Sequence, residues 1–173
     1  VEDVRLDVGK TTQVGGYTFT YVKPTSTITI RDGGVERINF GARMRVTKDG
    51  EFVANLDPAR GYYPSNAPFA FGPVGRFFEG EATSEVRMDP GLTRDVWVSV
   101  APDGQWITKV SDGLDRKLAK APVEQQLRAV GGLAAFYRAN PPAATFRILV
   151  SPMVLWVWVG GLIVIGGGLV AMW

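Results

Sequence analysis

The sequence predicts a mainly β fold, either a small β-sandwich or an open β-barrel-like domain with one amphipathic helix, followed by a single C-terminal transmembrane helix. Three observations support this prediction. Short alternating runs separated by turn dipeptides extend to about Val110, a helical pattern comes after them, and no charged residue occurs after Arg147. We therefore expect a β-rich domain at residues 1–145 with a helical insertion at about 114–140, and a membrane helix at 146–173.

The first strands are predicted from alternation. Residues 17–22 alternate Tyr, Phe and Tyr with Thr, Thr and Val, which is typical of a half-buried strand. Two further runs, at 27–30 and 35–42, flank the tripeptide Asp32-Gly33-Gly34. Several such units at short spacing favour a sandwich or an open barrel.

Two Asp-Gly pairs predict hairpins. Asp49-Gly50 separates a run that ends near Val46 from the run at 52–56. Asp103-Gly104 separates the run at 96–100 from the run at 106–110. Asp-Gly supplies the positive φ angles that a tight turn needs, so we expect a strand on each side of both pairs.

The helix at about 114–140 is predicted from capping and periodicity. Ala121-Pro122 suits a helix start, because proline is tolerated at the first helical position. Apolar residues then recur on one face, and Asn140-Pro141-Pro142 ends the pattern. The face consists of Val123, Leu127, Val130 and Ala134. We expect this helix to pack on the sheet rather than at a membrane surface.

The segment from Gly61 to Gly80 is rich in proline, glycine and aromatic residues. Two interpretations remain open. A loop that folds over one end of the sheet and buries its rings is favoured, and a contact surface for a partner or a membrane is the alternative. The candidate contact residues are Tyr62, Tyr63, Phe69, Phe71, Phe77 and Phe78.

The uncharged tail is predicted to be helical and to cross a bilayer. As a helix, residues 148–173 would extend about 39 Å, against about 30 Å for the hydrocarbon layer. The expected membrane-interface residues are Arg147, Trp156, Trp158 and Trp173, and the expected helix-packing residues are Gly160, Gly161, Gly166, Gly167 and Gly168. Other transmembrane helices, of the same protein or of a complex, are then expected partners.

Composition excludes several kinds of site. The 19 basic and 17 acidic residues are interspersed and give a net charge of +2, so we expect no nucleic-acid binding. The absence of cysteine and histidine excludes thiolate sites and histidine-based acid–base catalysis, so we expect no catalytic or metal-binding residues in this chain. One set of carboxylates, with Arg87 and Arg94 nearby, is better interpreted as solvated ion pairs than as an acid–base centre. It comprises Glu81, Glu85, Asp89 and Asp95.

Motifs spread along the chain resemble the C-terminal region of the CcmF-type cytochrome c biogenesis proteins, a family of membrane haem lyases. They occur in the expected order and end in the entry to a final helix. The stretch from Gly113 to Pro142 departs from the family, being longer than the corresponding link. The matching segments are Asp3–Leu6 with Gly9, Gly15–Phe19, Arg43–Leu56, Tyr62–Pro64, Asp89–Leu92, Arg94–Val98, and Phe146, Arg147, Pro152, Trp156–Trp158 and Gly160–Gly161.

The resemblance implies that this chain is the external domain and last helix of a longer membrane protein that attaches haem to apocytochrome c. It places the β-rich part on the extracytoplasmic, periplasmic side of the cell membrane. The haem-handling segment of the family lies upstream, so no haem ligand is carried over and this segment is expected to bind no cofactor itself. A scaffold or docking role toward the haem chaperone and apocytochrome c is what the resemblance implies. The alternative is a single-pass membrane protein whose β domain binds other proteins in envelope assembly or secretion.

Overall fold

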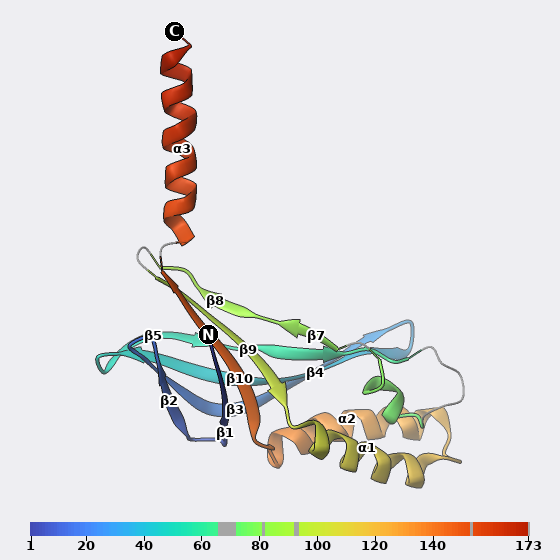
Figure 1. Ribbon diagram of the computed structural model, residues 1–173. Helices are drawn as coiled ribbons and strands as arrows, with labels where there is room; N and C mark the ends of the chain where they lie inside the picture. Colours follow the sequence, from blue (N-terminus) through green and yellow to red (C-terminus); the bar gives the residue numbers. More distant parts are fainter. Residues whose placement is uncertain (66–71, 81, 92–93, 153, 173) are drawn as a thin grey trace.

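The computed structural model describes residues 1–65, 72–80, 82–91, 94–152 and 154–172 (Figure 1). Within these residues the chain forms strands, a 3-10 turn (η1) and three α-helices. In order they are β1 (Glu2–Leu6), β2 (Thr11–Val14), β3 (Tyr17–Arg31), β4 (Gly34–Lys48), β5 (Glu51–Leu56), β6 (Ala59–Tyr62), η1 (Gly75–Phe77), β7 (Ala82–Glu85), β8 (Arg87–Asp89), β9 (Arg94–Pro102), α1 (Gly104–Leu118), α2 (Val123–Ala139), β10 (Ala144–Pro152) and α3 (Val154–Ala171). The mainly β prediction is confirmed.

The strands form two sheets. One has the order β1-β10-β9-β8, and the other has the order β2-β3-β4-β6-β7 with β5 paired to β4. The paired strands are antiparallel. The second sheet is built on the long β3–β4 hairpin and curves into a half-barrel (Figure 1). A register shift between Tyr21 and Lys23 interrupts this hairpin, and such bulges bend and twist a strand.

Two Asp-Gly turns close the β3–β4 and β4–β5 hairpins of the second sheet. Asp32 and Gly33 have φ angles of 51° and 77° between β3 and β4, and Asp49 and Gly50 have 51° and 84° between β4 and β5. Both central residues are left-handed in each turn, which matches the right-handed twist of the flanking strands. The hairpin at Asp49-Gly50 was predicted from the sequence and is confirmed, and the two runs that flank Asp32-Gly33-Gly34 in the sequence are the strands of the β3–β4 hairpin.

The β3–β4 hairpin contributes to two hydrophobic cores. Its open end, including Phe19 and Met44, packs against the first sheet at residues such as Val98 and Phe146. Its turn end packs against α1 and α2 in a second core, which we call the helix-side core and in which Tyr137 is fully buried. Alternating β4 residues are all fully buried, so one face of the strand serves both cores. These residues are Ile38, Phe40, Ala42, Met44 and Val46.

The predicted second hairpin is wrong, because residues 106–110 are helical. Asp103 has a φ of −59° and caps α1, with its Oδ1 accepting a hydrogen bond from the Gln105 backbone N at 2.9 Å. Aspartate satisfies the free N–H groups of a helix start as readily as it forms a turn. Ile107 and Ser111 then form the buried side of the helix, with the i, i+4 spacing of a helix rather than the alternation of a strand.

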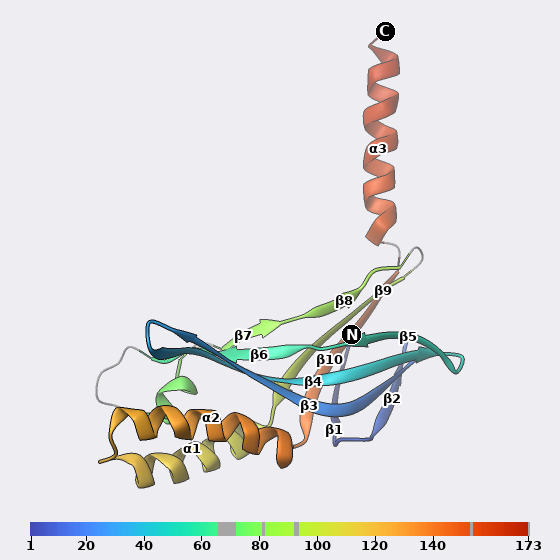
Figure 2. The same cartoon turned by 180° about the vertical axis from the view of Figure 1, so that it is seen from behind.

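Two helices replace the single predicted one. α1 and α2 lie side by side below the turn end of the second sheet in both views (Figures 1 and 2). α2 ends at Asn140, whose backbone N donates to the Phe136 carbonyl at 2.8 Å, so the predicted helix end is confirmed. Val130 and Ala134 of its predicted apolar face are buried, which confirms packing on the sheet.

The C-terminal transmembrane prediction is overturned. Of the helices in the described ranges, not one has both the length and the apolar character required to cross a bilayer. The reason is that β10 incorporates the apolar residues up to Pro152, which leaves 18 residues for α3. At 1.5 Å per residue these extend about 27 Å, less than the hydrocarbon layer of about 30 Å. The domain boundary predicted between residues 145 and 146 falls inside β10.

Candidate functional site: a polar cluster on the second sheet

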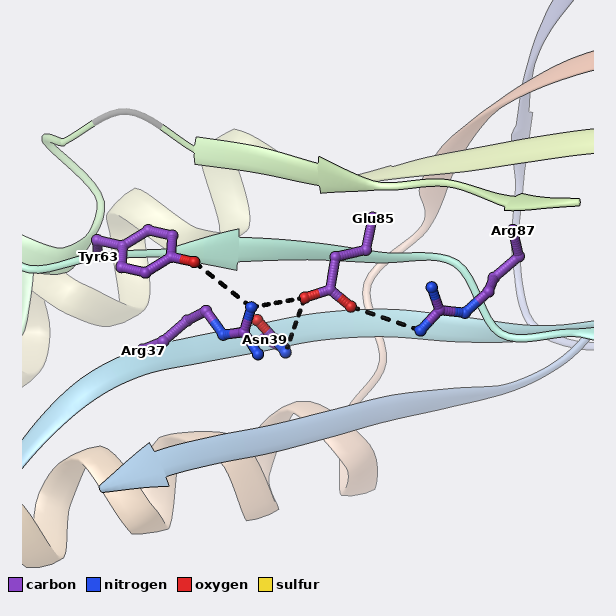
Figure 3. A network of polar contacts seen from close by, with 5 residues as sticks. All are labelled: Arg37, Asn39, Tyr63, Glu85 and Arg87. Carbon is purple, nitrogen blue, oxygen red and sulfur yellow. Dashed lines mark hydrogen bonds and ion pairs between the residues drawn. The ribbon is translucent and has the colours of Figure 1, made fainter. Parts of the chain in front are cut away.

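Five side chains from β4, β7, β8 and the loop after β6 meet around one carboxylate (Figure 3). Arg37 Nη1 donates to Glu85 Oε1 at 2.9 Å and to the Tyr63 hydroxyl at 3.4 Å. Asn39 Nδ2 donates to the same Glu85 oxygen at 3.3 Å, and Arg87 Nη2 lies 3.6 Å from Oε2. We call Arg37, Asn39, Tyr63, Glu85 and Arg87 the polar cluster.

The strand register explains how distant residues reach Glu85. Arg37 and Asn39 are two residues apart on β4, on the face opposite Ile38 and Phe40. β6 lies between β4 and β7, with Asn39 opposite Gly61 and Gly61 opposite Thr83. The Asn39 amide therefore crosses above β6 at a glycine to reach the next strand.

Gly61 is required for this crossing. A Cβ atom at Gly61 would lie 2.9 Å from Asn39 Oδ1 and 2.9 Å from Thr83 Oγ1. Such contacts are shorter than a carbon–oxygen contact allows, so any larger residue would displace the amide. The close approach is the structural reason for a glycine inside β6.

A polar cleft of about 230 Å³ lies beside the cluster. Asp57 on its wall forms a bidentate pair with Arg43, with both N to O distances at 2.8 Å. This pair lowers the pKa of Asp57, chiefly through the hydrogen bonds from Arg43. The cleft is lined by Thr25, Ser26, Thr27, Asn39, Gly41, Asp57, Ala59, Glu85 and Arg87.

The cluster has one unused acceptor and one well-exposed cation. Asn39 is 7% exposed, and its Oδ1 has no hydrogen-bond partner among the described residues. The side chain of Arg87 is 50% exposed at the cleft wall. The bond to Tyr63, followed by the charge of Glu85, raises the pKa of Arg37. The cleft thus offers the guanidinium of Arg87 to an anion or a carbonyl, whereas the Asn39 oxygen is buried beneath its surface.

The arrangement suits binding better than proton transfer. Both oxygens of Glu85 already face guanidinium or amide donors, so neither is free to accept a proton from a substrate in this geometry. In the described part of the chain, no three acidic side chains gather in a way that would hold a metal ion. The carboxylate instead fixes two arginines and one amide at the edge of a cleft.

The structure does not bring the carboxylates of the sequence analysis together. Glu85 lies in the polar cluster, and its predicted ion pair with Arg87 is present. Asp95 is buried on β9 and accepts a hydrogen bond from the Gly91 N at 3.1 Å. Asp89 lies on β8, and Glu81 falls outside the described residues.

Of the six aromatic residues predicted as partner contacts, three have their rings in or against the helix-side core. Tyr62 and Phe77 are buried there, and the Phe78 ring packs against the Tyr62 ring with centroids 5.0 Å apart. Tyr63 is half-buried and belongs to the polar cluster. Phe69 and Phe71 lie outside the described residues. Contact with a partner remains a prediction.

The residues assigned to a membrane interface lie on different elements. Arg147 is on β10 and makes a bidentate pair with Asp3 of β1, at 2.8 and 2.9 Å. Trp156 and Trp158 are exposed on α3, and Trp173 falls outside the described residues. The five glycines predicted to pack against other helices also lie on α3, where an added Cβ would meet no atom within 4 Å. Their role in helix packing remains a prediction.

Comparison with known proteins gives one similarity. No protein-family model matches the chain, and no solved structure matches it. The chain is similar to the cytochrome c-type biogenesis protein CcmF of Haemophilus influenzae, with 24% identity over 173 residues. The match covers 98% of this chain but 18% of the Haemophilus protein, so the chain spans less than a fifth of that relative's length. The resemblance predicted from sequence motifs is therefore supported as a weak similarity that extends along the whole chain.

Proposed function

We propose that this chain acts in cytochrome c maturation, as a scaffold or docking segment of an assembly that attaches haem to apocytochrome c. The similarity to CcmF along 98% of the chain is the observation that carries the proposal. A match of this extent includes both sheets and all three helices rather than one shared motif. The partners would be other components of a membrane-associated complex, among them a haem chaperone and apocytochrome c, on the extracytoplasmic side.

The form of the polar cluster supports docking rather than chemistry. Its one carboxylate is shared by two arginines, which leaves one positive charge in excess, and the register of β4, β6 and β7 fixes Arg37, Asn39 and Glu85. Fixed donors at a cleft rim bind a partner with little loss of side-chain freedom. Arg87, half exposed at this rim, is the residue that we expect a partner to touch.

Haem itself would be held outside this segment. The chain contains no histidine or cysteine, and the methionines in the described ranges do not lie together around a common cavity. Met44 is buried in the core between the sheets, Met88 is exposed on β8, and Met172 comes after α3. These residues do not fit a haem site, so we assign the segment a role in positioning partners.

The experiment is a complementation test in the organism that carries this chain. The coding region for residues 1–173 is deleted in frame, and covalently bound haem in c-type cytochromes is measured by haem staining of denatured proteins. We expect loss of covalent haem, with recovery when the segment is restored. Normal covalent haem after the deletion would refute a role in cytochrome c maturation.

A matched pair of variants tests the docking face. We expect Arg87→Ala to lower the yield of mature cytochrome c, while Arg31→Ala, at an exposed hairpin end, leaves the yield unchanged. Both variants must accumulate to the wild-type level. Equal cytochrome yields from the two would show that the polar cluster is not the docking face.

A further inference from the structure

An apolar groove runs between α1 and α2, away from the polar cluster. It encloses about 450 Å³, a volume within the range of ligand sites. Leu133 at its base is buried, whereas Phe136 at its edge is 44% exposed. The groove is lined by Lys109, Val110, Gly113, Leu114, Lys117, Ala129, Gly132, Leu133 and Phe136.

Small residues in the groove lining leave room for the backbone of another helix. Gly113 on α1 and Gly132 on α2 line it, and an added Cβ at either would meet no atom within 4 Å. With Ala129 one turn before Gly132, these positions let another backbone approach more closely than leucine would permit. Helices that pack side by side lie about 8–10 Å apart, and small residues favour the shorter distances.

Two lysines give the groove its charge. Lys109 and Lys117 are eight residues apart on α1, so their Cα atoms are separated by about 12 Å along the helix. Among the described residues, none of those that line the groove is acidic. Of the nearby acids, Asp115 accepts hydrogen bonds from the backbone N atoms of Val74 and Gly75, and Glu124 pairs with Arg128. Asp112 lines a separate surface pocket beside Lys109.

We propose that this groove binds an amphipathic helix of a partner protein that carries acidic residues beside its apolar face. Acidic side chains seven or eight residues apart on one helix are separated by about 10–12 Å, which matches the two lysines. A single-chain fatty acid has one carboxylate and would leave one lysine unmatched. A second copy of this chain fits poorly, because α3, its exposed apolar helix, carries no charged residue. The inference does not depend on a role in cytochrome c maturation.

The test uses the full chain and a designed fluorescent peptide. The peptide is helical, with a leucine stripe flanked by glutamates at i, i+7 and i+8, and its binding is measured by fluorescence anisotropy. We expect saturable binding that a peptide with lysines in place of the glutamates does not show. Charge reversal by Lys109→Glu with Lys117→Glu should weaken binding of the glutamate peptide roughly tenfold and restore binding of the lysine peptide.

Matched variants separate the groove from general effects. Gly132→Leu should fill the groove and weaken binding at least tenfold, whereas Gly131→Leu, at the neighbouring position outside the groove lining, should leave binding unchanged. Lys120→Glu is the control for net charge. Equal binding of both peptides, equal effects of the two leucine variants, or displacement of the glutamate peptide by an equimolar amount of oleate would each overturn the proposal. So would concentration-dependent dimerisation that blocks peptide binding and that Gly132→Leu abolishes.

Discussion

Replacing Glu85 by alanine should destabilise the protein by about 2–3 kcal/mol. The substitution removes a charge-assisted hydrogen bond of 2.9 Å to Arg37, in a pair whose side chains are 31% and 24% exposed. Such a bond contributes about 1.5–3 kcal/mol when buried, so about 1.5 kcal/mol is appropriate at this exposure. The longer bond to Asn39 adds about 1 kcal/mol because that amide is buried and would lose its acceptor. The ion pair with Arg87, at 3.6 Å and half exposed, adds at most about 0.5 kcal/mol.

Urea unfolding monitored by circular dichroism measures this loss. Glu124→Ala is the matched control, because it removes an exposed i, i+4 pair with Arg128 in which the Glu124 side chain is 76% exposed. The control should cost at most about 0.5 kcal/mol. Glu85→Gln, which keeps an acceptor but loses the charge, should fall between the two. If Glu85→Ala costs no more than Glu124→Ala, the polar cluster does not stabilise the sheet and the reasoning fails.

Three further perturbations probe other parts of the fold. Burial raises the pKa of Tyr21 and Tyr62 to about 12, so the folded chain retains protons that the unfolded chain releases near pH 10. From these two residues, stability should therefore hold below pH 10 and fall between pH 10 and 12 by up to about 2.7 kcal/mol per pH unit. The last part of the tyrosinate absorbance should rise together with unfolding, and complete tyrosine ionisation well before unfolding would contradict the burial. Gly61→Ala should cost about 1–3 kcal/mol in urea unfolding, because it displaces the Asn39 side chain. If the double variant Gly61→Ala with Asn39→Ala is no less stable than Asn39→Ala alone, the Asn39 amide is the group that the new Cβ displaces. Asp103→Ala should cost about 1 kcal/mol and lower the helical signal, because α1 loses its N-cap, and an unchanged unfolding midpoint would exclude that role.

An Asp-Gly pair in the sequence indicates a change of chain direction, but it does not by itself distinguish a hairpin turn from a helix start. Asp49-Gly50 and Asp103-Gly104 look alike, yet the first closes a hairpin and the second begins α1. The distinction lies downstream, where Trp106, Val110 and Leu114 recur every four residues and all pack toward the helix-side core. That spacing predicts a helix, because a strand at 106–110 would have placed Trp106, Thr108 and Val110 on one face.

The tail shows the opposite problem, since composition alone predicted a longer helix than the chain forms. Residues 148–152 belong to the same uncharged segment as α3, but Ile148 pairs with Glu2 of β1 on one side and Val98 of β9 on the other. Ile148 is 0% exposed in the core between the sheets, and this burial favours a strand at residues 148–152 over a longer helix. Such pairing joins residues almost 150 positions apart, and no local pattern indicates it.

The polar cluster was inaccessible to sequence reasoning for the same reason. Glu85 and Arg87 are close in sequence, and their pairing was expected, but Arg37 and Asn39 are 48 and 46 residues from Glu85. Only the order β4-β6-β7 brings them together. The sequence pattern places Gly61 in the loop-like segment 61–80 rather than in a strand, so the close approach that the Asn39 amide requires at this glycine is seen only in the structure.

The β4 strand connects the two proposed surfaces while keeping them apart. Arg37 and Asn39 point toward the polar cluster, whereas Phe40, on the other face, stacks on Tyr137 of α2 with ring centroids 4.4 Å apart. The Tyr137 hydroxyl also donates to the Gly41 carbonyl at 3.2 Å, so α2 is fixed to the strand that carries the cluster. A partner at the cleft and a partner helix in the groove would therefore lie on opposite faces of one sheet, without competing for space. A segment that positions two components of an assembly relative to each other needs this separation, together with a rigid connection between the two faces.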